Sequence, residues 1–302
     1  MLKKFSVSNF KGFETELLFD LTSSNGYTFN PSCIKNGVVN NCMVYGHNGC
    51  GKSNLGLAIF DIIGHLTDKH RDLRRYQNYL NAYSTDEVAK FSYEFLLEGN
   101  LIRYEYLKTD YTIIVSETLW INEKEVVGFN RSGGNTRFTT TLKGTETLNK
   151  VIEDSSLSVL KYIKNNTVLA SNEENNAFVR FYSFVENMLF FRSLEDRIYL
   201  GQDAEIKSPI TSEIIKRNKV QEFEDFLNEA HVKCKLTVVE TLNGQDLAFD
   251  FGEKKLLFAN VMSTGTSAVM LFFYWYMLIQ EAKVSIVFID EFDAFYHHDL
   301  SK

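Results

Sequence analysis

The sequence predicts a mixed α/β fold, and three stretches of the chain support that prediction. A short apolar run at 41–45 precedes a glycine-rich segment, after which helical periodicity begins at Asn54. Apolar and polar residues alternate over 91–106, as in an antiparallel hairpin. The run at 284–289 is uninterrupted and apolar, which is typical of a buried parallel strand. Strands are therefore expected at both ends of the chain, with helices between them.

The first third of the chain is predicted to be largely β. Two short runs, 2–9 and 16–21, flank a turn at Gly12 and predict a hairpin, and a polar loop follows over 22–37. The apolar run 41–45 predicts a strand and 54–66 a helix. Residues 67–84 are predicted to be mostly helical, and the alternating pattern then predicts a hairpin that turns at Gly99-Asn100.

The rest of the chain alternates between the two kinds of element. Further strand character is expected over 112–121, an exposed loop over 131–145 and helices over 147–187. An amphipathic helix is predicted at 220–230, strands at 236–239 and 247–251, and a buried helix at 267–281.

Composition limits the class of protein. The chain has 302 residues, of which 44% are hydrophobic, with 25 Phe, 15 Tyr and only 2 Pro. This is enough apolar material for a core and excludes a wholly disordered chain. The net charge of −7 means that contact with nucleic acid would need a local basic patch.

Cysteine spacing and the apolar runs indicate a cytoplasmic protein without a membrane partner. The four cysteines form no CxxC pair, so neither a disulfide framework nor a zinc ribbon is expected. The first ten residues contain no apolar signal core. The longest apolar run, 268–279, is too short to span a bilayer.

The most specific motif follows the predicted strand at 41–45. It has the P-loop spacing of a glycine, four residues and then Gly-Lys-Ser, and a helix follows it. Such a loop turns backbone N–H groups toward phosphates, while Lys52 reaches the β- and γ-phosphates and Ser53 holds Mg²⁺. The predicted nucleotide-binding residues are Gly46, His47, Asn48, Gly49, Cys50, Gly51, Lys52, Ser53 and Asn54.

A second motif closes the apolar run 284–289. Asp290 and Glu291 follow that run directly, as in a Walker B element. Asp290 is predicted to support the metal together with Ser53, and Glu291 to polarise the attacking water as the catalytic carboxylate. An apolar strand followed by two acidic residues is common by itself, but a P-loop fold requires such a strand.

A third motif, the residues Ser263-Thr264-Gly265-Thr266-Ser267, precedes the predicted helix at 267–281. Its residues suit an ordinary Ser/Thr helix cap, and they also suit an anion site at a helix N-terminus.

Together these motifs resemble those of ABC-type ATPases. The chain shares the order P-loop, Ser-x-Gly and Asp-Glu, and Asn9-Phe10-Lys11-Gly12-Phe13 resembles the Asn-Phe-Lys-x-Phe opening of the SMC, RecF and OLD branch. It is similar in particular to the short AAA-type ATP-binding proteins of bacterial abortive-infection and phage-defence systems. The resemblance covers both ends of the chain, whereas residues 130–220 match no known pattern.

The resemblance implies an ATPase head with an N-terminal antiparallel β layer and an inserted helical lid. In that family two subunits enclose two nucleotides, and the Ser-x-Gly element of one caps the γ-phosphate held by the other. ATP and Mg²⁺ are then the cofactors, and Ser263, Thr264, Gly265 and Thr266 act in trans. A homo-oligomer, at least a dimer, and a separate effector protein are the implied partners.

The implied domains are a nucleotide-binding lobe over 1–130, a mainly helical lid over 131–230, and the signature and Walker B part over 231–302. The chain departs from the family pattern in two places. Gln77 is a weak match to the Q-loop glutamine, and the chain ends at Lys302, before a further core strand and a switch histidine are expected. His297 and His298 lie too close to Glu291 for that role. The C-terminal part is therefore expected to be incomplete.

Weaker features have simpler interpretations. Two basic clusters are interpreted as solvated surface rather than as a nucleic-acid site. The first consists of Lys69, His70, Arg71, Arg74 and Arg75, and the second of Lys216, Arg217 and Lys219. The aromatic run 272–276 is interpreted as core, and Cys50 as a small filler. Two alternative functions stay open, a DNA-repair or chromosome-maintenance ATPase of the RecF or SMC type and a nucleotide-dependent scaffold with little turnover. ATP is only mildly favoured over GTP.

Overall fold

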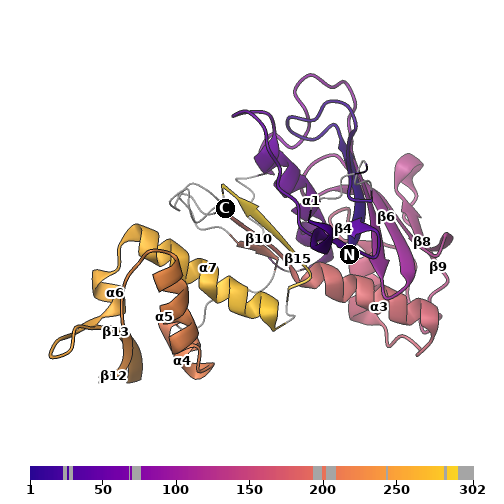
Figure 1. Cartoon of the computed structure of the whole chain (residues 1–302). Helices are drawn as coiled ribbons and strands as arrows, with labels where there is room; N and C mark the ends of the chain where they lie inside the picture. Colours follow the sequence, from indigo (N-terminus) through magenta and orange to yellow (C-terminus); the bar gives the residue numbers. More distant parts are fainter. Residues whose placement is uncertain are drawn as a thin grey trace. The chain divides into compact units, whose positions relative to one another are not determined.

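The computed structural model describes residues 1–22, 26, 30–67, 69, 76–192, 199–201, 209–242, 244–281 and 284–291. The chain divides into two compact units, Met1–Met188 and Leu189–Lys302. Figure 1 shows elements of both units. The predicted domain boundaries after residues 130 and 230 stay a prediction.

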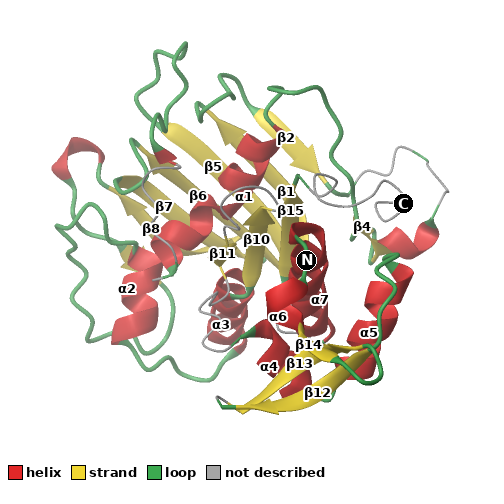
Figure 2. Cartoon of the chain, turned by 90° about the vertical axis from the view of Figure 1, so that its left-hand side faces the viewer, coloured by secondary structure: helices red, strands yellow, loops and turns green. Residues whose placement is uncertain are grey.

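The first unit is built on a seven-stranded antiparallel sheet (Figure 2). The strand order is β2-β1-β5-β6-β7-β8-β9, and every neighbouring pair is antiparallel. The strands are β1 (Leu2–Ser8), β2 (Leu17–Asp20), β5 (Ala89–Leu97), β6 (Asn100–Lys108), β7 (Ile114–Ile121), β8 (Lys124–Asn130) and β9 (Thr139–Thr140). This sheet confirms the predicted N-terminal antiparallel layer.

The hairpin of β5 and β6 shows why the alternating pattern predicts this sheet. Phe91 pairs with Tyr106, Tyr93 with Tyr104 and Phe95 with Ile102, so one face of the hairpin is apolar and buried. The turn consists of Glu98 and Gly99, one residue earlier than predicted. Both residues have a positive φ, 47° and 86°, as a type I′ turn requires.

Three α-helices lie in the described residues of the first unit: α1 (Lys52–Leu66), α2 (Val159–Asn166) and α3 (Glu173–Glu186). The Tyr93 hydroxyl donates to the α1 carbonyl of Ala58 at 3.0 Å, which joins the helix to the sheet. The Phe95 ring packs on Phe181 and Phe184 of α3, with centroids 5.6 and 5.3 Å away. The helix predicted over 54–66 is therefore present, and within the predicted helical stretch 147–187 the helices occupy 159–166 and 173–186, with no helix over 147–158.

Two predictions for the first unit are wrong. Residues 41–47, all of them described, form no strand, and Tyr45 is 88% exposed. The elements that precede them are the 3₁₀ turn η1 (Pro31–Cys33) and a short hairpin of β3 (Ile34–Lys35) and β4 (Val38–Val39). An apolar run becomes a strand only where a neighbouring strand satisfies its backbone, and the run itself does not encode that neighbour. Residues 77–88 contain no helix, because their polar groups bind the 9–13 turn instead.

The described residues of the second unit form two three-stranded sheets and four α-helices. One sheet has the order β11-β10-β15 and the other β12-β13-β14. The strands are β10 (Met188–Arg192), β11 (Tyr199–Gly201), β12 (Leu236–Thr241), β13 (Gly244–Asp250), β14 (Lys255–Leu257) and β15 (Ile286–Asp290). The helices are α4 (Ile210–Lys216), α5 (Val220–Glu229), α6 (Phe258–Val261) and α7 (Thr264–Gln280).

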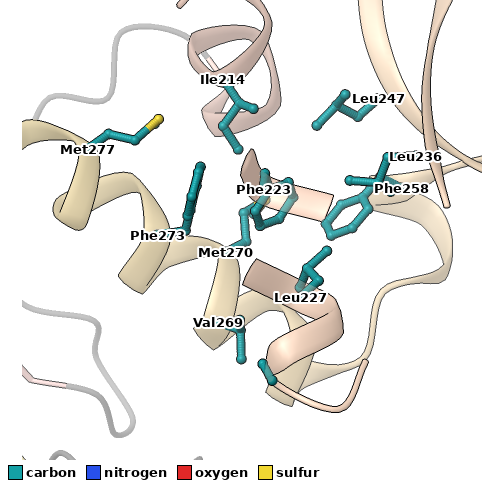
Figure 3. Close-up of a cluster of buried hydrophobic side chains, with 11 residues drawn as sticks. Ile214, Phe223, Leu227, Leu236, Leu247, Phe258, Val269, Met270, Phe273 and Met277 are labelled. Carbon is teal, nitrogen blue, oxygen red and sulfur yellow. The ribbon is translucent and has the colours of Figure 1, made fainter. Parts of the chain in front are cut away.

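Helix α7 is the centre of the second unit's core. Phe273 on one side of α7 packs against Phe223 of α5, with ring centroids 5.0 Å apart, inside the cluster drawn in Figure 3. Trp275 on another side belongs to a second buried cluster with Leu189. This confirms that the aromatic run 272–276 includes core residues. In the part of the chain that the structure describes, no helix is both long and apolar enough to cross a membrane.

Candidate nucleotide-binding site

The P-loop forms an exposed turn that ends at the first residue of α1. Gly49 and Gly51 have φ values of 80° and 103°, and Gly51 is the N-cap of the helix. Both conformations favour glycine, since a side chain would clash with its own backbone. A Cβ at Gly46 would lie 2.5 Å from the Cys50 sulfur, so this third glycine lets the loop close on itself.

Lys52 folds back into the loop that precedes it. Its Nζ donates to the carbonyl oxygens of Gly46 at 2.7 Å and of His47 at 2.9 Å. The first N–H groups of α1 have no partner within the helix, and the helix dipole places partial positive charge at the same end. An ammonium and a helix N-terminus on one exposed turn form a site suited to a polyphosphate.

The turn at residues 9–13 lies against the P-loop. A Cβ at Gly51 would be 3.2 Å from the Phe13 ring, and a Cβ at Gly12 would be 3.1 Å from the Asn54 side-chain nitrogen. Phe10 and Phe13 exchange backbone hydrogen bonds of 3.0 and 2.8 Å, which close the turn. The sequence motif that marks the family resemblance therefore packs on the predicted phosphate site.

A second segment, residues 77–88, holds the 9–13 turn in place. The Asn9 side chain donates to the carbonyls of Asp86 at 2.6 Å and Val88 at 3.0 Å. The Asn81 side chain donates to the Lys11 carbonyl at 2.6 Å, and the Lys11 amide donates to the Tyr79 carbonyl at 2.9 Å. Sequence reasoning missed this 77–88 segment, because it has no motif of its own.

The carboxylates predicted to bind the metal and to catalyse hydrolysis, Asp290 and Glu291, lie at the carboxyl end of strand β15 in the second unit. Asp290 is the last residue of the strand and is 6% exposed. Glu291 follows with a φ of 56°, a left-handed conformation that is uncommon for a residue with a side chain. The predicted strand is thus present, and it presents the two acidic residues at its carboxyl end.

The Ser263–Ser267 motif begins helix α7 as a helix cap. The Ser263 hydroxyl accepts from the Thr266 amide at 3.1 Å and lies 2.9 Å from the Thr266 hydroxyl. Thr264 and Gly265 form the first turn. The capping interpretation is confirmed within the single chain, and the action of these residues in trans stays a prediction.

The remaining predicted residues lie partly inside and partly outside the described part of the chain. The Lys69 ammonium donates to the Glu186 carbonyl at 2.7 Å, while His70, Arg71, Arg74, Arg75, His297 and His298 lie outside the described residues. Gln77 accepts from Lys11 Nζ at 3.0 Å through its backbone carbonyl. Lys216, Arg217 and Lys219 pair with nearby glutamates, as expected of a solvated face.

The donor set suits the two implied cofactors. Backbone N–H groups and the Lys52 ammonium suit the phosphates of ATP, and hydroxyl and carboxylate oxygens, as on Ser53 and Asp290, are the ligands that Mg²⁺ prefers. The P-loop residues lie in the first unit, whereas Ser263–Thr266, Asp290 and Glu291 lie in the second.

Comparisons with known proteins identify the family. No curated protein matches the sequence. Among solved structures, the SMC head domain from Thermotoga maritima is similar, with 14% sequence identity and a TM-score of 0.43. The alignment covers 99% of this chain and 80% of the SMC head domain chain. The family model described as "AAA domain, putative AbiEii toxin, Type IV TA system" matches residues 43–302. The resemblance to AAA-type proteins of abortive-infection systems is thereby confirmed, and the chain belongs to this family of AAA-domain P-loop ATPases.

Proposed function

We propose that this protein binds and hydrolyses ATP and that two copies associate around the nucleotide. The observation that carries the proposal is the glycine loop folded around the Lys52 ammonium at the N-terminus of α1. Membership of an AAA-domain family supports ATP as the nucleotide.

Each residue of the proposed site has a defined task. Lys52 exchanges its two carbonyl partners for the β- and γ-phosphate oxygens, and the first amides of α1 bind the same phosphates. Ser53 and Asp290 hold Mg²⁺, which as a Lewis acid neutralises charge on the phosphates when it is bound. Glu291 orients a water molecule and accepts its proton as the water attacks the γ-phosphate.

Association of two copies completes the proposed site. Ser263 and Gly265 start α7, whose N-terminus carries partial positive charge. In the proposed dimer they contact the γ-phosphate bound to the partner's P-loop, so that the complex forms only while ATP is intact. Hydrolysis then releases the two copies from each other.

The proposed biological role is that of the sensor or motor subunit in a phage-defence system. The matched family carries the description of an AbiEii toxin and a Type IV toxin–antitoxin system, and this supports a role in abortive infection. In such a role the ATP-dependent association controls a separate effector protein.

The test is to measure ATP binding and phosphate release for the wild type and for Lys52→Ala. Loss of the ammonium should weaken ATP binding at least about a hundredfold, because charge-assisted bonds to two phosphates are lost. The control is Lys90→Ala, an exposed lysine on β5, which should leave both quantities unchanged. Unaltered affinity in Lys52→Ala would contradict the assignment of the phosphate site.

The same assay separates the two alternative functions. A RecF- or SMC-type ATPase predicts that duplex DNA raises the rate, with strong dependence on salt. A nucleotide-dependent scaffold predicts tight binding and a slow basal rate that Glu291→Gln leaves unchanged. The proposed function predicts no effect of DNA and a clear loss of phosphate release in Glu291→Gln.

A further inference from the structure

Helix α1 carries a fully buried negative charge that the proposed chemistry does not use. Asp61 is 0% exposed, and its Oδ2 accepts from the Lys108 ammonium at 2.8 Å and from the Tyr106 hydroxyl at 2.9 Å. Its Oδ1 accepts from the Tyr79 hydroxyl at 3.0 Å. Lys108 is also 0% exposed. One carboxylate thus holds three directed hydrogen bonds inside the core of the first unit.

Such a group is costly, and its cost indicates a role other than stability. Burying an ion pair removes two charges from water, and an apolar pair of similar volume is often as stable or more stable. The best-attested use of buried polar groups is to fix one packing arrangement among several. Among the other buried residues of α1, the apolar contacts of Leu55, Ile59, Ile62, Ile63 and Leu66 are not directional, whereas His65 makes one further directed contact, 2.8 Å from the Tyr104 hydroxyl.

The partners of Asp61 come from the sheet and from the 77–88 segment that holds the 9–13 turn. Tyr106 and Lys108 belong to strand β6 of the sheet. Tyr79 belongs to the 77–88 segment, and its backbone carbonyl accepts from the Lys11 amide of the 9–13 turn. That turn packs on Gly51, the N-cap of α1. The contacts therefore form a closed ring from α1 through Tyr79 and the 9–13 turn back to the start of α1.

We propose that Asp61, with Lys108 and Tyr79, is a positioning residue for phosphate binding at the P-loop. A rotation of α1, or a shift along its axis, would lengthen or misalign these three hydrogen bonds. Lys52 precedes Asp61 by nine residues on the same helix, about 13 Å along its axis. Because α1 is a continuous helix, fixing its rotation and axial position at Asp61 also fixes where Lys52 and the amides of the first turn lie. This inference rests on the proposed nucleotide-binding function.

The test removes the directed bonds while it keeps the volume. The triple variant Asp61→Leu/Lys108→Met/Tyr79→Phe leaves no buried charge behind, and the Tyr106 hydroxyl keeps its contact with the Tyr93 hydroxyl at 3.1 Å. We expect it to unfold at or above the wild-type midpoint temperature but to bind ATP at least about tenfold more weakly. A neutral variant that retains hydrogen bonds, Asp61→Asn/Lys108→Gln, should bind ATP with wild-type affinity.

One control and one conservative variant separate positioning from stability. Phe138→Leu weakens a buried contact with Tyr162 in the same unit, outside the ring of contacts, and should leave ATP affinity unchanged. Tyr79→Phe alone removes only the bond to the 77–88 segment, and its folded state needs no repacking. It should weaken ATP binding about threefold, so the proposal stays testable if the triple variant does not fold.

The outcomes are distinct. Wild-type affinity in a folded triple variant, or in Tyr79→Phe, overturns the positioning role and leaves the proposed function intact. Equal losses in the triple variant and in Phe138→Leu also overturn it, since general destabilisation would then explain both. A wild-type protein that does not bind ATP overturns the proposed function and the positioning role together.

Discussion

His65 shows how strongly a single buried residue in the first unit is constrained. Its Nε2 lies 2.8 Å from the Tyr104 hydroxyl, which itself donates to Glu117 at 2.7 Å, so Nε2 carries the proton toward Tyr104. Its Nδ1 lies 4.0 Å from Asp61 Oδ2. Burial lowers the pKa of His65 well below its ordinary value, and the nearby Lys108 charge lowers it further. The folded protein therefore holds this imidazole neutral.

The stability of the folded protein should consequently fall in mild acid. Below about pH 6.5 the unfolded chain binds a proton on this histidine that the folded chain does not, so stability is lost between that pH and the lower folded-state pKa. Between pH 7.5 and 5.5 the loss reaches about 1.4 kcal/mol. His65→Gln keeps a donor toward Tyr104 and does not titrate. Urea unfolding should show a pH dependence smaller by that amount, and an identical pH dependence in both chains would contradict this explanation.

At the scale of elements, two helix caps allow the structural role of a capping residue to be separated from a role in ATP hydrolysis. Ser263 caps α7, and Asn172 caps α3 in the same way, accepting from the Asn175 amide at 2.9 Å. Both contacts satisfy one amide of a first helical turn. Of these two caps, Ser263 is the one proposed to act on a second copy of the chain.

Ser263→Ala and Asn172→Ala form a matched pair for that reason. Each should lower the free energy of unfolding by about 1 kcal/mol through loss of the cap. Ser263→Ala should also lower the ATP hydrolysis rate at least about tenfold, through a lost contact in the transition state. Asn172→Ala should hydrolyse ATP at the wild-type rate. Equal rates in the two variants would leave Ser263 with the capping role alone.

Elements with a local pattern could be predicted from the sequence. The β5–β6 hairpin and helix α5 follow from periodicity, because one face of each is buried and the other is not. The P-loop could be predicted from the spacing of its glycines, and Gly49 and Gly51 have the positive φ values that favour glycine. The domain boundaries and the catalytic roles in the site stay predictions.

Features that depend on distant partners could not be predicted. The strand expected at 41–45 is absent there, because its apolar residues do not specify a neighbour. The 77–88 segment binds the 9–13 turn mainly through backbone carbonyls, which every residue possesses. The buried Asp61–Lys108 pair joins residues 47 positions apart, and neither residue has a local signature.

At the scale of the whole molecule, the proposed function predicts a change of oligomeric state. Glu291→Gln keeps the size of the side chain but cannot accept the proton of the attacking water, so ATP should stay intact and the dimer should accumulate. Size-exclusion chromatography with light scattering should show a dimer with ATP and a monomer without it. The control is Lys52→Ala/Glu291→Gln, which should stay monomeric under both conditions. A monomer with ATP in the single variant would count against association around the nucleotide.

The attachment of the 9–13 turn has a consequence for biosynthesis. Asn9 is held by carbonyls 77 and 79 residues further along the chain, so its hydrogen bonds are among the non-local contacts of the first unit. Non-local contacts form late, since a long segment must be closed before they are made. A nascent chain on the ribosome therefore cannot complete the surroundings of Gly51 until residue 88 has emerged. Truncated products that end before this point should lack a formed phosphate site.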